Sequence, residues 1–225
     1  MDHETVTTTT TEAAADDAAP EARTLTLDIE HGCVRALLLH AATKDVRYYL
    51  NGVCVDTTGP TACMVATDGH RLLALPIMHI YDGLPRGCYI IPRDALAKVK
   101  PRKVDRKHVA PIRITLTANG VTGTLPPRYM IEGDATVTGD CIDGRFPEWR
   151  RIVPRSPSGK PGQFNGAYLG DFHEAAKLIG GGNGVATLTH NGDAAALVRL
   201  PLEAVGVIMP MRADEPLKTA PDWIG

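Results

Sequence analysis

The sequence predicts an α+β fold built from a repeated unit of one strand, one helix and three further strands. Short runs rich in Val, Leu, Ile and Tyr are separated by Gly, Pro and Asp turns, which is typical of strands in antiparallel sheets. Apolar residues at helical spacing follow the first strand of each set. The same order recurs three times along 225 residues, a length that suffices for one large domain or two small ones.

The first unit begins with a strand that contains Leu25, Leu27 and Ile29, because these residues alternate with polar ones. Apolar residues at helical spacing from Val34 to Ala41 then predict a helix. Turn signals at 58–60 and 68–69 divide the next stretch into three strands. These strands are expected at 46–56, 62–67 and 70–77.

The second and third units repeat this order. A strand at 88–91 precedes a helix that opens with Pro92, a residue suited to the first helical turn, and runs through Leu96 and Val99. The strands of the second unit are expected near 112–118, 121–125 and 135–142. The third unit is expected to have a strand at 162–165, a helix at 168–179 ended by a run of Gly, and strands at 185–190, 194–200 and 205–211.

Composition divides the chain into five segments. Residues 1–22 hold Thr, Ala and acidic residues with almost no apolar material, which predicts a disordered acidic tail. Residues 23–154 contain two units and form the predicted complete domain, and 155–162, rich in Pro and Gly, are the predicted linker. Residues 163–212 hold the single third unit, and 213–225 form a C-terminal tail.

Composition also excludes several classes of protein. No run approaches the roughly 20 apolar residues of a membrane helix, and the first residues lack the pattern of a secretory signal, so we expect a cytoplasmic protein. The Cys and His residues show no C-x-x-C, H-x-H or H-x-x-x-H spacing, so we expect no metal site and no cofactor. A net charge of -2 is unusual for a nucleic-acid binder, but positive charge is concentrated between Arg93 and Arg113.

Five segments of the chain resemble the β subunit of bacterial DNA polymerase III, the β sliding clamp, and they occur in that family's order. They are D-V-R-Y-Y-L-N-G from Asp45, V-A-T-D-G-H-R-L from Val65, I-I-P-R from Ile90, D-G-R-F-P-E-W-R-R-I-V-P from Asp143 and V-I-M-P-M-R from Val207. The first, second and fourth are long and unusual. The resemblance covers about residues 24–212.

The resemblance implies a DNA-clamp fold, with helices lining a pore and antiparallel sheets outside. A chain of that family has three domains of two half-domains each, and its ring holds twelve half-domains. This chain resembles only three of them, since the family's first domain and the first half of its third are missing. Three half-domains reach twelve in a homo-tetramer. We expect head-to-tail contacts in which residues 25–29 pair with strands around 164–168 or 185–200 of the next chain.

By resemblance, the chain is a processivity factor: a ring that encircles double-stranded DNA of any sequence and is not an enzyme. Since the family's helices face the pore, basic residues on or near them are the expected DNA contacts. These residues are Arg35, Lys44, Lys98, Lys100, Arg102, Lys103 and Lys177. The alternative for the stretch from Lys98 to Lys107 is a solvated charged loop, because Pro101 favours the end of the helix there.

The resemblance also implies a hydrophobic pocket in which DNA polymerase and the clamp loader dock through short peptide motifs. Its expected residues are Thr67, Gly69, His70, Arg71, Leu72, Pro154, Val207, Ile208, Met209, Pro210, Met211 and Arg212. Flexible Met side chains suit a surface that accepts several related peptides. The alternative for residues 207–211 is an ordinary buried strand. Residues 213–225 extend past the family's usual end, which puts free access to the pocket in question.

Two other functions stay open at the level of the sequence. A clamp-like chain that forms no ring would act as a regulator or decoy, binding replication proteins and titrating them. An enzyme using Asp68 and His70 as acid and base is the third class, although no nucleophile or second carboxylate accompanies them in a motif. Phe146 and Trp149 are expected to cap a core at a domain edge.

Overall fold

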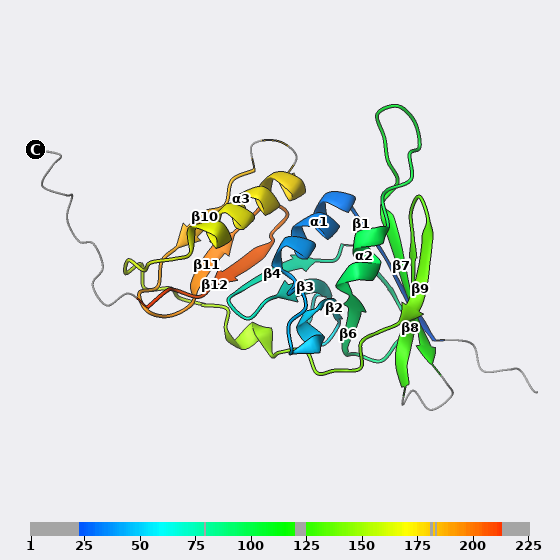
Figure 1. The fold of residues 1–225 in the computed structure, drawn as a ribbon, viewed down its shortest axis with the longest axis horizontal. Coiled ribbons are helices and arrows are strands. Elements are labelled where there is room, and N and C mark those ends of the chain that lie inside the picture. The colour runs from blue at the N-terminus through cyan, green and yellow to red at the C-terminus, as the bar shows by residue number, and fades with distance from the viewer. Residues whose placement is uncertain (1–22, 79, 120–124, 181, 183, 213–225) are drawn as a thin grey trace, which may run out of the picture.

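The computed structural model describes residues 23–78, 80–119, 125–180, 182 and 184–212. The predicted tails at 1–22 and 213–225 lie outside the described residues. Three α-helices cover one side of two antiparallel sheets (Figure 1). The helices are α1 (His31–His40), α2 (Arg93–Lys98) and α3 (Gly166–Gly180), and short 3-10 helices lie at Tyr48–Leu50 and Trp149–Arg151.

Twelve strands form the two sheets within the described ranges. The five-stranded sheet has the order β5 (Ile80–Asp82), β1 (Thr24–Ile29), β7 (Ile112–Asn119), β8 (Leu125–Glu132), β9 (Thr136–Asp140). The seven-stranded sheet has the order β10 (Thr187–Thr189), β11 (Ala196–Arg199), β12 (Val205–Ile208), β4 (Arg71–Pro76), β3 (Cys63–Thr67), β2 (Gly52–Asp56), β6 (Cys88–Pro92).

These elements form three units: unit 1 from β1 to β4, unit 2 from β6 to β9, and unit 3 from α3 to β12. Units 1 and 2 exchange their first strands. Strand β1 of unit 1 pairs with β7 of unit 2, and β6 of unit 2 pairs with β2 of unit 1. Because each sheet contains strands of both units, the two units form one interlocked body.

Unit 3 contacts unit 1 through both the sheet and the helix layer. Strand β12 pairs antiparallel with β4, so the seven-stranded sheet continues past the predicted linker at 155–162. Helices α1 and α3 pack closely, since a Cβ atom at Gly32 would lie 2.1 Å from the carbonyl oxygen of Leu178. Phe172 of α3 and Leu37 of α1 belong to one core cluster with Leu73 of β4. One hydrophobic core therefore spans all three helices.

The structure corrects two of the predicted strands. No strand forms at 162–165, because this segment is bonded to the β10–β11 turn: Gly192 N donates to Lys160 O over 2.7 Å, and Gly162 N donates to His190 Nδ1 over 3.1 Å. Strand β8 runs over Leu125–Glu132, which the sequence did not predict, since Pro126 and Pro127 weaken a strand pattern. Residues 121–124 of the strand expected at 121–125 lie outside the described residues.

Other differences concern edges and element starts. The prediction that residues 25–29 form an open sheet edge is wrong, because β1 lies between β5 and β7. The expected edge around 164–168 is also wrong, since helix α3 begins at Gly166. The strand expected at 46–56 starts with a 3-10 turn and becomes extended only at Gly52. Strand β5 is an addition to the predicted elements.

Candidate peptide groove and basic surface

A rigid turn connects β3 to β4. The Thr67 hydroxyl donates to Arg71 O over 2.7 Å and accepts from Gly69 N over 3.0 Å. The Asp68 carboxylate accepts from the backbone N–H groups of His70 and Arg71 over 2.8 and 3.0 Å. Gly69 has φ +91°, a conformation that favours Gly. The Asp68 carboxylate is therefore committed to shaping the turn, which removes the support for a catalytic Asp68–His70 pair.

Pairing of β4 with β12 brings together the two halves of the predicted pocket. Leu72 lies opposite Val207, and Met209 N donates to His70 O over 2.8 Å. Leu72 and Val207 belong to a second apolar cluster on the sheet face opposite the helices, and Val153 packs against it. Residues far apart in sequence thus share one wall.

The predicted pocket residues divide between the two sheet faces. Leu72 and Val207 lie in the outer cluster, whereas Ile208 is fully buried in the helix-side core and supports the groove from beneath. The exposed fractions of Met209 and Met211 are 41% and 56%, which leaves both side chains accessible. Pro154 and Pro210 are half-buried and Arg212 is exposed.

A hollow adjoins this wall on the outer face. Its volume is about 240 Å³, and its lining includes Ala74, Val205, Trp149 and Val153. Ala74 and Val205 lie opposite each other in the β4–β12 ladder, one step along the same face from Leu72 and Val207. A larger hollow of about 760 Å³ lies beside the 143–151 segment and includes none of the predicted pocket residues. The smaller hollow is the one continuous with the groove.

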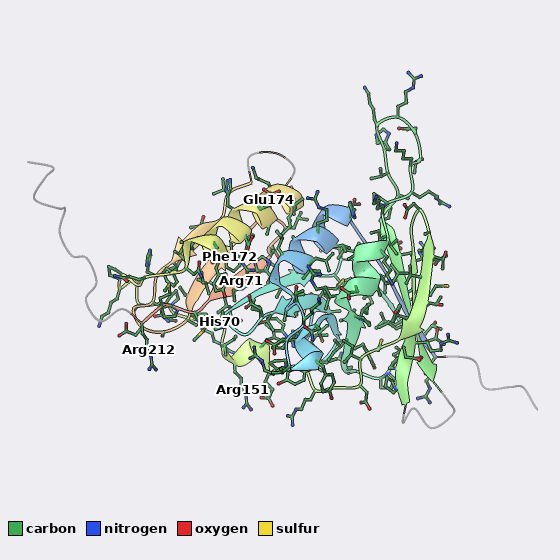
Figure 2. The ribbon with its side chains drawn as sticks, in the orientation of Figure 1. His70, Arg71, Arg151, Phe172, Glu174 and Arg212 are labelled. Atoms are coloured by element: carbon green, nitrogen blue, oxygen red, sulfur yellow. The ribbon has the colours of Figure 1, made fainter. Side chains whose placement is uncertain are left out.

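Arg71, a predicted pocket residue, instead joins β4 to both neighbouring helices (Figure 2). Its guanidinium forms a salt bridge with Asp171 of α3, donates to Leu39 O over 2.8 Å, and contacts Asp68 Oδ2 at 3.1 Å. It also lies 4.4 Å from the centroid of the Tyr168 ring. Only 10% of the Arg71 side chain is exposed, so its positive charge is largely taken up by these partners.

The same junction contains His40, Tyr168 and Phe172, which the sequence did not assign to a site. The His70 and Tyr168 rings stack with centroids 6.0 Å apart. His40 is fully buried, donates from Nδ1 to Ala36 O over 2.9 Å, and lies 4.6 Å from the Phe172 ring. Burial lowers the pKa of His40 to about 4, so this imidazole is neutral at physiological pH. No local pattern marks these residues, because their partners come from another unit.

A segment that follows β9 caps the outer face of the sheet. Phe146 is buried in the outer cluster, and Trp149 packs against it, which confirms their predicted capping role. Asp56, 1% exposed, accepts from Trp149 Nε1 over 2.7 Å and from the Thr58 hydroxyl over 2.6 Å, and it pairs with Arg150. Burial acts to raise the pKa of Asp56, but these bonds outweigh it and hold the pKa below its ordinary value.

All seven predicted DNA-contact residues are exposed. Arg35 of α1 and Lys177 of α3 alternate with buried residues that pack on the core, so they lie on solvent-facing helix surfaces. Helix α2 ends at Lys98, and Lys100, Arg102 and Lys103 follow it, as Pro101 suggested. Lys44 lies in the connection between α1 and the 3-10 helix at Tyr48–Leu50. The predicted contacts therefore lie on the helices and on the connections that follow α1 and α2.

That loop, residues 102–110, is an ordered hairpin that projects from the body between α2 and β7 (Figure 1). Lys103 forms an isolated bridge with Val109, and Ala110 N donates to Arg102 O over 2.8 Å. At its tip, Asp105 accepts from the backbone N–H groups of Lys107 and His108 over 2.7 and 2.8 Å. The hairpin thus presents its basic side chains on a defined backbone.

No helix in the described part of the chain is both long and apolar enough to cross a membrane.

Comparison with known proteins supports the clamp fold. The chain is similar to the β sliding clamp of Escherichia coli K12, with 36% identity over 124 residues, which is 55% of this chain and 31% of that protein. It is 32% identical to the β sliding clamp of Pseudomonas aeruginosa over 117 residues, 51% of this chain and 29% of that protein. The matched sequence thus spans about a third of these relatives' length.

Solved structures of β clamps share the fold. The Caulobacter crescentus β sliding clamp aligns with a TM-score of 0.60 at 19% identity, covering 89% of this chain and 68% of that one. A Helicobacter pylori β clamp aligns with a TM-score of 0.62 at 12% identity, covering 89% and 69%. The predicted α+β clamp fold is confirmed. Because the family model for the DNA polymerase III β subunit, central domain, matches residues 29–148, more than half of the chain, the protein belongs to the β sliding clamp family.

Proposed function

We propose that this chain is a subunit of a DNA sliding clamp, which encircles duplex DNA and tethers a replicative polymerase through a hydrophobic peptide groove. In this role it binds and holds, and it catalyses no reaction. The observation that carries the proposal is the β4–β12 pairing, which sets Leu72 beside Val207 on one outer face. Two segments that resemble the family's pocket meet there although they are far apart in sequence.

The groove has the properties that a peptide partner needs. Its floor is apolar and buried at Leu72 and Val207, and Met209 and Met211 stand exposed at its edge. The adjoining hollow of about 240 Å³ has room for an apolar side chain. Thr67, Gly69 and His70 form the turn at one end, and Pro154 lies at the rim. Short motifs of a polymerase and a clamp loader are the proposed occupants.

The helix side has the properties that a sliding contact needs. Exposed cations on α1, α2 and α3 and on the connections that follow α1 and α2 provide long-range attraction to phosphate, which holds duplex DNA without reading its bases. The proposed contacts are Arg35, Lys44, Lys98, Lys100, Arg102, Lys103 and Lys177. Residues 23–154 supply a complete two-unit domain, and 163–212 supply a single unit. A ring of twelve units then requires four chains.

Calorimetry with a peptide that carries a polymerase-type clamp-binding motif tests the groove. Replacing Met209 and Met211 together by Ala should weaken binding by about 1–3 kcal/mol, because central apolar anchors dominate such interfaces. Met78→Ala is the matched control, since Met78 is 82% exposed and lies outside the groove. Absence of peptide binding, both in the full chain and in a chain that ends at Arg212, would refute the groove.

The decoy alternative shares this groove and differs in forming no ring. No feature of the described residues favours it. The mass of the particle in solution separates the two, because a decoy stays near the 24.1 kDa of one chain.

A further inference from the structure

The contact between units 1 and 2 is self-complementary, because each unit contributes the same two strands to it. The first strand of each unit, β1 or β6, adds to the second strand of the other, β7 or β2. Both pairings are antiparallel. A contact in which element i meets j while j meets i has the form of a two-fold, isologous interface. Two units of this kind therefore dock by a local two-fold axis.

The contact between units 1 and 3 has the same form with different strands. The last strand of each unit, β4 or β12, pairs antiparallel with the other. Gly32, near the start of α1, approaches Leu178, near the end of α3, as expected for antiparallel helices. The chain thus contains two kinds of junction: exchange of first strands, and pairing of last strands. In each junction the two units contribute the same set of strands.

The two ends of the chain expose different sides of these junctions: the β9 end presents a last strand, and the β10 end presents a second strand without a first strand beside it, since unit 3 opens with α3. At one end, β9 is the last strand of unit 2, the counterpart of β4 and β12, and it closes the five-stranded sheet. Residues along β9 alternate between exposed and half-buried. At the other end, β10 is the counterpart of β2 and β7, and it closes the seven-stranded sheet. Among the described residues, no strand of another unit covers its outer edge.

The β10 end has the surface of an incomplete junction. All five residues of β2 are buried, whereas Thr187 of β10 is exposed and Leu188 only half-buried. Val185, just before β10, is 70% exposed. A hollow of about 550 Å³ lies at this end, lined in part by Gly180, Val185 and Leu200. Apolar surface that units 1 and 2 bury against each other is left open in unit 3.

We propose that each end docks on the same end of a second copy of this chain: unit 3 on unit 3, and β9 on β9, each across a local two-fold axis. Four chains then close a ring through two alternating, isologous contacts. A head-to-tail contact would instead place a last strand, β9, on a second strand, β10, which neither internal junction does. The ring itself rests on the proposed function, and the symmetry of its contacts goes beyond it.

Light scattering on three charge variants of the full chain tests this symmetry. Thr136→Asp with Thr138→Asp places carboxylates on exposed residues of β9, where a two-fold contact centred on Thr138 sets residue 138 opposite its own copy and residue 136 opposite Asp140 of the second copy. Val185→Asp with Thr187→Asp places carboxylates on the exposed surface at the β10 end. Val46→Asp with Met78→Asp is the matched control, because these residues are 95% and 82% exposed and lie at neither end.

The expected particle has four times the 24.1 kDa mass of the chain, and the control variant keeps it. Each end variant should give a dimer through the remaining contact, and the combined variant a monomer. A head-to-tail ring has one kind of contact, so either end variant would then give a monomer, which overturns the inference. A wild-type monomer also overturns it, and peptide binding measured on that monomer shows whether the groove survives.

A cross-link provides a second readout that needs no disruption. Thr138→Cys in a Cys88→Ser background places a thiol at the centre of β9 and removes the exposed Cys88. In β9-to-β9 docking centred on Thr138, the introduced thiols of two neighbouring copies meet. A small disulfide oxidant then joins them: both thiols give up their protons as the S–S bond forms, and the oxidant is reduced to two thiols. Covalent dimers are expected on a non-reducing gel. Their absence in an assembled tetramer overturns the two-fold contact.

Discussion

Single residues at the junction of units 1 and 3 explain why this junction is specific. Arg71 reaches α3 through Asp171 and Tyr168, and α1 through Leu39 O. Such a side chain fixes the angle between elements, because its planar guanidinium has several donors in fixed directions. The polar network therefore determines how the two units meet, while the apolar contacts around Phe172 stabilise them.

Removing the Arg71 guanidinium should destabilise the junction. Arg71→Met leaves the Asp171 carboxylate and Leu39 O without their donor, so the free energy of unfolding should fall by about 2 kcal/mol. Arg145→Met is the control, because Arg145 is 86% exposed in its pair with Glu148 and such pairs contribute little. Urea unfolding measures both, and equal effects of the two variants would contradict the role of Arg71.

His40 should make stability depend on pH. Its folded pKa is about 4 and its ordinary value 6.5, so between these values the unfolded chain binds the proton that the folded chain excludes. The free energy of unfolding should therefore fall as pH drops from about 6.5 to about 4, by roughly 3 kcal/mol from this group. No described acceptor faces Nε2. His40→Gln should flatten the pH profile of urea unfolding, and an unchanged slope would exclude His40.

At the scale of elements, periodicity predicted most strands and all three helices, but not which strands pair. Strand β1 alternates as a half-buried strand does, yet its pairing with β7 of another unit depends on the packed core. Strand β8 escaped prediction because Pro126 and Pro127 lack N–H donors. The structure places them near a register shift between Thr117 and Asn119, where the ladder is already interrupted.

For the proposed pocket too, the sequence indicated which segments take part, but not which of their side chains face the groove. The resemblance named residues for both walls of the proposed pocket, and the β4–β12 register sets two of them, Leu72 and Val207, opposite each other. It also named Ile208 and Arg71, which belong to the helix side of the sheet. A strand exposes alternate residues to opposite faces, so a contiguous run of predicted pocket residues always includes some that face away.

The basic loop and the end of α2 should act as one electrostatic element. Reversing Lys98, Lys100, Arg102 and Lys103 to Glu should weaken direct DNA association and reduce the slope of its salt dependence by about 0.9 for each phosphate that the variant no longer neutralises. Reversal of Arg86, Arg145, Arg151 and Arg155, which are exposed and lie outside the helix layer and this loop, is the matched control. Fluorescence anisotropy across salt concentrations that shows equal slopes in both variants would remove the loop from the DNA surface.

At the scale of the whole molecule, the three units of residues 23–212 determine which contacts a ring of these chains would need. Units 1 and 2 exchange their first strands within the chain. Unit 3 packs on unit 1 only, through the β12–β4 pairing and the contact of α3 with α1. The resemblance to a longer family defined which units are present, since each has recognisable segments. It did not define the contacts at the chain's ends, because these depend on which strands form the sheet edges: β5 and β9 in one sheet, β6 and β10 in the other.

A closed ring should be held on DNA by topology rather than by charge. A linear duplex with biotin at both ends lets rings thread on, and streptavidin added afterwards blocks the ends. At about 1 M salt, where screening acts over about 3 Å, direct binding to phosphate becomes negligible. Protein should then stay on the blocked duplex and leave the open one. The combined β9 and β10 end variant, expected to be monomeric, should leave both. Equal dissociation of the wild-type protein from blocked and open duplexes would show that the chain binds DNA without encircling it.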